Sequence, residues 1–100
     1  MAKALLNKGV ALGVLNRTDG EMAVYDDLVG RFGISTEPAL QEAVAKALFN
    51  KGVTLSVLSH RDGAIAVYDD LVGRFGIATE PALREALAKA VRNKNALKAT

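Results

Sequence analysis

Apolar residues recur at helical spacing through the middle of the chain. Between residues 36 and 58 they are three, four or seven positions apart, at Leu40, Val44, Leu48, Leu55 and Leu58. Such spacing places side chains on one stripe of an α-helix. Thr36 is a suitable N-cap, and Pro38 falls in the first turn, where its missing N–H does no harm. We therefore predict a helix from about residue 36 to residue 58.

A second helix is predicted after a break at residues 59–62. Between residues 63 and 75 one side carries Ile65, Tyr68, Leu71, Val72 and Phe75. Asp62 is placed to cap this helix, and Gly76 stands where helices often end in a left-handed residue. In the earlier equivalent segment, Thr18 and Glu21 have the spacing of a capping box. No segment alternates with a period of two, so we predict an all-α chain of about five helices.

The whole pattern occurs twice. Residues 23–34 and 66–77 share the identical sequence AVYDDLVGRFGI, and residues 2–44 match residues 45–87 at 32 of 43 positions. A partial third copy begins at residue 88. A period of this length is typical of solenoids, in which each unit buries its apolar face against its neighbours. We predict a single domain over residues 1–100, with units 2–44 and 45–87 and a partial unit 88–100.

Composition narrows the class of protein. Half of the residues are apolar and the formal net charge is only +2, so this is a globular chain without a strong basic bias. Cysteine is absent, which excludes disulfides and thiolate metal sites. No apolar run is long enough for a membrane span, and the N-terminal segment matches an internal one, unlike a signal peptide. We expect a cytoplasmic protein with no membrane partner.

At this point the residues resemble a known repeat. Asn50 and Gly52 lie between Leu48 and Leu55, and a second-helix pattern follows; together they look like a tetratricopeptide repeat. The second-helix matches are Ala64, Ile65 and Tyr68, and the first-copy equivalents are Leu5, Asn7, Gly9, Leu12, Met22 and Tyr25. The resemblance implies a right-handed α-solenoid of helical hairpins, here two units and a final helix.

The chain departs from that family in three ways. Its unit has 43 residues where the usual length is 34, and we interpret the extra nine as a lengthened first helix. Lys8 and Lys51 stand where the family has Leu before the first-helix glycine. Glu21 replaces the small residue at the hairpin crossing, although Ala64 keeps it in the second copy.

Glycines inside the predicted helices require a reason. Gly9 and Gly52 each cost about 1 kcal/mol relative to Ala at a mid-helix position. Close approach of the paired helix supplies the reason, and we expect Gly30 and Gly73 to serve the next hairpin in the same way. These glycines do not form a phosphate-binding loop.

Candidate catalytic chemistry is sparse. The two YDD sequences offer paired carboxylates, but we expect the tyrosines to pack inward and Asp27 and Asp70 to form surface ion pairs with Arg31 and Arg74. His60 is the single histidine and falls in a predicted turn without partners for metal binding or catalysis. We predict a protein that is not an enzyme and needs no cofactor or metal.

The resemblance instead implies a peptide-binding groove on the first helices. Carried over position by position, it gives ten candidate groove residues: Lys3, Leu6, Val10, Val14, Lys46, Phe49, Val53, Val57, Lys89 and Arg92. The best-known carboxylate clamp of the family needs Lys and Asn where this chain has Leu6 and Val10, so that ligand is disfavoured. We expect a peptide or partner helix with apolar anchors and some negative charge.

Differences between the copies favour the same surface. Leu6 becomes Phe49 and then Arg92, and Ala11 becomes Thr54, while the predicted buried positions hardly change. Varied contacts to a ligand would produce such differences, and so would drift on an exposed face.

Two alternatives remain at this stage. Near-identical units can stack end to end between chains, which would make a homo-oligomer. Nucleic-acid binding is the less favoured alternative. Seven basic residues lie along the first helices, which favours it. However, acidic residues are dispersed among them, and no aromatic side chains offer a surface for base stacking. The seven are Lys3, Lys8, Lys46, Lys51, Lys89, Arg92 and Lys94.

Overall fold

The computed structural model describes residues 1–99, and in this range it contains helices and no strands. The five helices confirm the predicted all-α class. They are α1 (Ala2–Val14), α2 (Thr18–Phe32), α3 (Pro38–Val57), α4 (Arg61–Phe75) and α5 (Pro81–Lys98). As expected from the extra nine residues, α3 continues through them as one long helix. None of the described helices combines the length and apolar content needed to cross a bilayer.

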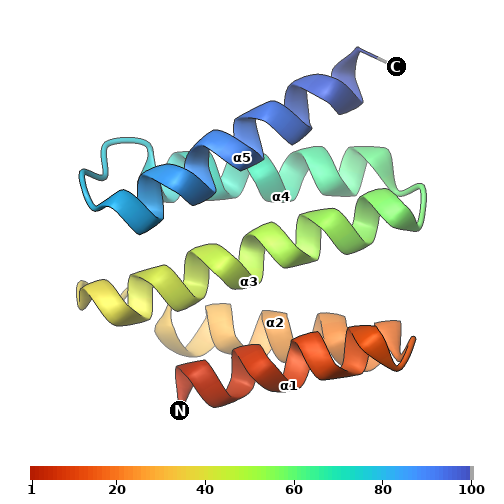
Figure 1. Ribbon diagram of the computed structural model, residues 1–100, viewed down its shortest axis with the longest axis horizontal. Helices are drawn as coiled ribbons and strands as arrows, with labels where there is room; N and C mark the ends of the chain where they lie inside the picture. The colour runs from red at the N-terminus through yellow and green to blue at the C-terminus, as the bar shows by residue number, and fades with distance from the viewer. Residues whose placement is uncertain (100) are drawn as a thin grey trace.

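The helices form two layers. Each helix packs against the next one in the chain, and α3 also packs against both α1 and α5. Figure 1 shows these three helices side by side, with α2 and α4 in a layer behind them. The central helix α3 contacts all four of the others, whereas α1 contacts only α2 and α3.

The core lies between the two layers. The second helices contribute two tyrosines and two leucines that are almost fully buried, namely Tyr25, Leu28, Tyr68 and Leu71. Val44 on α3 and Leu83 on α5 fill the other side. The prediction for Leu58 was wrong: it is the C-cap residue of α3 and is exposed, because the helical stripe stops before reaching it.

Two glycines leave the space that the buried tyrosine rings occupy. A Cβ atom on Gly9 would lie 2.4 Å from the Tyr25 ring, and one on Gly52 would lie 2.3 Å from the Tyr68 ring. Both distances are far below van der Waals contact, so each tyrosine ring rests directly on the backbone of the paired helix. The predicted close approach is confirmed at both positions.

The same expectation was wrong for Gly30 and Gly73. A Cβ atom at either position would meet nothing within 4 Å. These glycines face open space on the outer side of α2 and α4, and nothing in the structure explains why they are glycine.

Helix ends also differ from the predicted caps. Asn16 and Ser59 adopt left-handed φ values of 60° and 62° at the turns after α1 and α3. Gly76, predicted to be left-handed, has a right-handed φ of −58°. A sequence pattern that seeks glycine for every left-handed position therefore finds the wrong residue at these ends.

None of the three predicted N-caps forms. The residue before α3 is Glu37 rather than Thr36, and the residue before α4 is His60 rather than Asp62. Thr18 and Glu21 make no capping box at the start of α2. Glu21 is instead turned inward, where its carboxylate has other partners.

Lysines at equivalent positions of α3 and α5 form ion pairs with the second helices. Lys51 of α3 donates to Asp26 Oδ1 of α2 at 2.6 Å, and Lys94 of α5 pairs with Asp69 of α4 in the same way. The Lys94 ammonium lowers the pKa of the Asp69 carboxyl, mainly through this hydrogen bond. Each ion pair joins a second helix to the first helix of the following unit.

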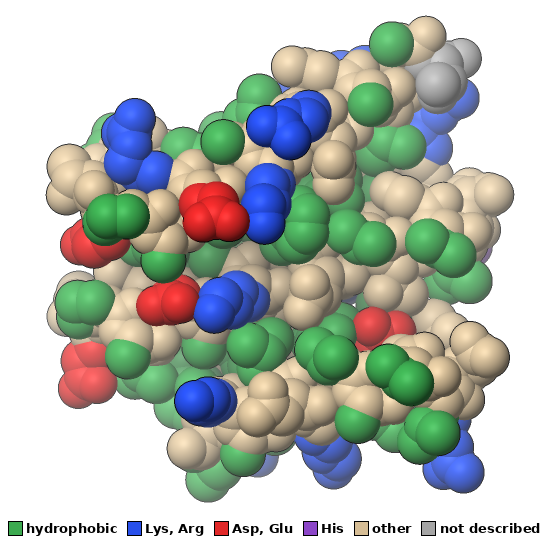
Figure 2. Space-filling view, in the orientation of Figure 1, with side chains coloured by type: hydrophobic (Ala, Val, Ile, Leu, Met, Phe, Trp, Pro, Cys, Tyr) green, Lys and Arg blue, Asp and Glu red, His purple; other side chains and the backbone are tan. Residues whose placement is uncertain are grey.

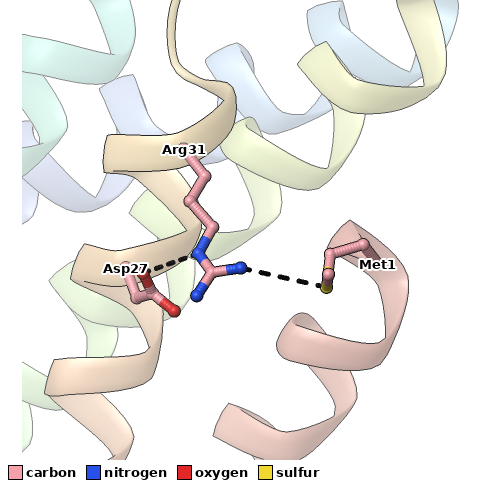
Figure 3. A network of polar contacts seen from close by, with 3 residues as sticks. All are labelled: Met1, Asp27 and Arg31. Carbon is pink, nitrogen blue, oxygen red and sulfur yellow. Dashed lines mark hydrogen bonds and ion pairs between the residues drawn. The ribbon is translucent and has the colours of Figure 1, made fainter.

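The other two aspartates of the YDD sequences form the predicted surface pairs. Asp27 and Asp70 accept hydrogen bonds from Arg31 Nε at 2.8 Å and Arg74 Nε at 3.1 Å. Arg31 also reaches the start of α1, where its Nη1 lies 3.9 Å from the sulfur of Met1 (Figure 3). In each YDD sequence, one aspartate thus pairs within its own helix and the other pairs with the following helix.

Candidate binding groove

Three adjoining hollows open on the face formed by α1, α3 and α5. They have volumes of about 470, 500 and 490 Å³. Figure 2 shows this face: charged side chains gather toward the N-terminal ends of α1, α3 and α5, and hydrophobic side chains gather toward the C-terminal ends of α1 and α3. The face therefore has one charged end and one apolar end.

The structure brings nine of the ten candidate residues to these hollows. They are Lys3, Leu6, Val10, Val14, Lys46, Phe49, Val53, Val57 and Lys89. Arg92 is exposed on α5 and is not among the lining residues. Leu6 and Phe49 also pack partly against the core, and the Phe49 ring centroid lies 6.1 Å from that of Tyr68. Their role in binding stays a prediction.

The apolar end is a groove between the C-terminal halves of α1 and α3. We call it the valine groove, lined by Val10, Gly13, Val14, Asn16, Thr18, Glu21, Tyr25, Asn50, Val53, Thr54, Val57 and Leu58. Its valines are four residues apart on each helix and so share one face. Val14 and Val57 each leave 78% of their surface exposed. Exposed apolar residues grouped around a hollow are typical of a protein-binding surface.

A carboxylate lies at the base of the valine groove. Glu21 of α2 is only 7% exposed, and its Oε2 accepts hydrogen bonds from the Tyr25 hydroxyl at 3.0 Å and the Thr54 hydroxyl at 3.1 Å. Gly13 makes room for it, because a Cβ atom there would lie 2.7 Å from Oε2. Glu21 thus occupies space that glycine leaves free at the hairpin crossing.

The other carboxylate oxygen faces the opening. In residues 1–99, Glu21 Oε1 accepts no hydrogen bond, yet no fully buried side-chain oxygen there lacks a partner. Oε1 must therefore be accessible from outside the protein. Because Glu21 lines the valine groove, the groove is the surface that this oxygen reaches.

The hydroxyl beside the carboxylate is held in its neutral form. Burial raises the pKa of Tyr25 well above its usual value, and the hydrogen bond to Glu21 and the carboxylate charge raise it further. A hydrogen bond involving Asn50 opposes this shift. Tyr25 therefore remains a hydrogen-bond donor to Glu21 throughout the neutral range.

The second unit has no such carboxylate. Ala64 takes the place of Glu21, Ser56 that of Gly13, and Leu97 that of Thr54. The corresponding hollow between α3 and α5 is about 360 Å³ and is lined by Val53, Ser56, Val57, Tyr68, Asn93, Ala96 and Leu97. The two units thus offer an acidic groove and its nearly apolar counterpart.

This contrast corrects one step of the sequence interpretation. The change from Ala11 to Thr54 was attributed to ligand contacts or drift on an exposed face. In the structure Thr54 is partly buried and donates to Glu21. Sequence reasoning noticed Glu21 as an unusual residue at the hairpin crossing but did not place it in a groove. The signal was present in the joint change of Gly13, Glu21 and Thr54 between the copies.

The charged end is largely balanced by the protein itself. Lys46 pairs with Glu42 at 3.0 Å, and Lys89 pairs with Glu85 at 3.1 Å. These exposed pairs are worth little in stability but reduce the positive field over the hollow. Little charge is left at this end to attract the negatively charged ligand that the sequence suggested.

Comparison with known proteins gives no further guide. No family model, curated protein or solved structure matches the chain. The function is therefore inferred from the geometry of the face formed by α1, α3 and α5.

Proposed function

We propose that the chain is a protein-interaction module. Its helices form a right-handed solenoid of tetratricopeptide-like hairpins, and a segment of a partner protein lies along α1, α3 and α5. The chain binds rather than catalyses, and its partner is a protein or peptide.

The exposed valines around the groove carry the proposal. Val14 and Val57 are not buried as core valines are: each leaves 78% of its surface exposed to water. Covering one valine side chain is worth about 1.5–3 kcal/mol when it is fully buried. Four valines around one hollow can therefore anchor a short apolar segment.

The experiment uses peptides selected from a random displayed library against the whole chain. Replacing both Val53 and Val57 by Asp should weaken binding of the selected peptides at least tenfold, measured by titration calorimetry. Ile77→Asp is the matched control, because Ile77 is 96% exposed and lies outside the groove. Binding that survives the double variant, or fails equally in the control, would contradict the proposal.

End-to-end assembly is a less favoured function. Lys8 on α1 corresponds to Lys51 and Lys94, and it has no acidic partner within residues 1–99, so the outer face of α1 resembles a docking face. However, both outer helices, α1 and α5, are first helices of a unit. Regular stacking would place two first helices in succession, without the second helix that each ion pair requires.

Nucleic-acid binding is also less favoured. Of the seven basic residues along the first helices, four form ion pairs with acidic residues of the chain: Lys46, Lys51, Lys89 and Lys94. Phosphate binding depends on basic side chains that are free to replace counterions. A surface already neutralised in this way is better suited to a protein partner.

A further inference from the structure

We propose that Glu21 makes the valine groove a subsite for one basic side chain, a lysine or arginine of the partner segment, flanked by apolar residues. This inference rests on the proposed function and specifies the chemistry of its ligand. It also reverses the charge expected from the sequence, because the basic residues that suggested an acidic ligand are at the other end of the face.

The geometry leaves half of the carboxylate available. Oε2 is fully engaged by the hydroxyls of Tyr25 and Thr54, which fix the orientation of the side chain. Oε1 has no hydrogen-bond partner within the part of the chain that is described, and it belongs to a residue that lines the valine groove. A preoriented acceptor at the base of an apolar groove suits a charged N–H donor.

Residues 1–99 supply no cation to this carboxylate. The six ion pairs among residues 1–99 do not include Glu21. Burial of a carboxylate without a positive partner is unfavourable. The fold does not depend on it, because the second unit builds the same hairpin with Ala64. A cationic group of a ligand would pair with this carboxylate, whereas the packing of the hairpin does not require it.

The residues around the carboxylate change together between the units. Glu21 contacts Gly13 and Thr54, and the equivalent positions hold Ser56, Ala64 and, in the partial third copy, Leu97. The two full units match at 32 of 43 positions. Glu21 is replaced together with the two residues that contact it. This favours one local arrangement, in which Gly13 of α1 supplies space, Glu21 of α2 the charge and Thr54 of α3 the orienting hydroxyl.

The walls of the groove suit the rest of such a side chain. Lysine and arginine carry a long apolar stem behind the charged group. Val10 and Val53 line the same groove as Glu21 and can cover that stem while the charged group reaches Oε1. An acidic ligand would meet the carboxylate instead and be repelled.

The test uses two small probes and nuclear magnetic resonance titration of the backbone amides. The probes are n-butylguanidinium and its uncharged isostere n-butylurea. We expect n-butylguanidinium to shift the amides of Gly13 and Thr54 and to bind about tenfold more tightly than n-butylurea. In Glu21→Gln, which keeps the shape and can still accept from both hydroxyls, the two probes should bind equally.

A gain-of-function variant separates the subsite from simple loss of structure. Ser56→Gly, Ala64→Glu and Leu97→Thr together rebuild the arrangement between α3 and α5, and guanidinium binding should appear there. Equal binding of both probes to the wild-type chain, or no binding of either, would overturn the subsite.

Failure of the subsite can be told apart from failure of the proposed function. If the selected peptides need Val53 and Val57 but carry no basic residue that depends on Glu21, the groove stands and the subsite falls. If the selected peptides ignore the valines, the proposed function falls, whatever the probes show.

Discussion

Gly52 and Gly73 are both glycines within helices, but their surroundings are opposite. We expect Gly52→Ala to lower the free energy of unfolding by roughly 1–2 kcal/mol, because the added Cβ would meet the Tyr68 ring and outweigh the gain in helix propensity. Gly73→Ala should raise it by roughly 0.5–1 kcal/mol, because its Cβ enters open space. Urea denaturation followed by circular dichroism measures both.

Each glycine variant is the control for the other, since both add one methyl group to a helix. A loss of stability in Gly73→Ala, or a gain in Gly52→Ala, would contradict the packing described for the tyrosines.

At the scale of single residues, the sequence was informative where the chain repeats a motif. Gly52 predicted a close approach of the paired helix, because glycine is costly in the middle of a helix, and the Tyr68 ring makes that approach. Gly73 shows the limit of this reasoning. In the sequence a solvent-facing glycine cannot be distinguished from a packed one. Only the arrangement of the helices separates the two cases.

At the scale of elements, the turns after α1 and α3 carry strain that one substitution can remove. Ser59 has a φ of 62°, where a side chain costs about 1–2 kcal/mol and glycine costs nothing. We expect Ser59→Gly to stabilise the protein by about 1 kcal/mol. Asn16→Gly should gain less, because asparagine tolerates this conformation better. Thermal and urea unfolding of both variants give the comparison.

Destabilisation by Ser59→Gly would show that the turn gains more from the serine side chain than from a relaxed backbone. An equal gain in both variants would mean that asparagine offers no advantage here.

The helices themselves were predictable, and their ends were not. The spacing of Val44, Leu48 and Leu55 fixes which stripe of α3 faces inward, because burial of that stripe dominates the packing. Caps involve one or two hydrogen bonds of about 1 kcal/mol, so tertiary contacts easily override them. Glu21 is the example: its carboxylate bonds to Tyr25 and Thr54 rather than to the start of α2.

At the scale of the whole molecule, α3 holds the structure together. It packs against all four other helices, whereas α1 touches only two. We expect Gly9→Ala to reduce hydrogen-exchange protection in α1 and α2 by a free energy of about 1–2 kcal/mol, with α4 and α5 unchanged. Gly52→Ala should reduce protection in all five helices, because it loosens the helix that they share.

Amide exchange measured by mass spectrometry or magnetic resonance resolves the helices. Loss of protection spread over every helix in Gly9→Ala would show that the protein opens as one cooperative unit rather than by neighbouring pairs.

The candidate groove was only partly predictable from the sequence. Positions such as Val10 and Val53 were predicted from the resemblance to tetratricopeptide repeats, carried over position by position. The carboxylate of Glu21 reaches that face from α2, in the other layer, through the space left by Gly13. Whether the Glu21 carboxylate reaches the groove depends on how α1 and α2 cross. Helical periodicity within one segment does not predict that crossing.

The identity of residues 23–34 and 66–77 has a consequence for folding. A chain with two interchangeable second helices has a competing topology, in which α2 docks where α4 belongs. In that arrangement Glu21 would face Ser56, which is equivalent to Gly13. A Cβ atom at Gly13 would already lie 2.7 Å from the Glu21 carboxylate, and serine carries such an atom. The mismatch raises the energy of the misassembled chain. Besides charging the groove, Glu21 therefore disfavours one wrong pairing of the near-identical helices.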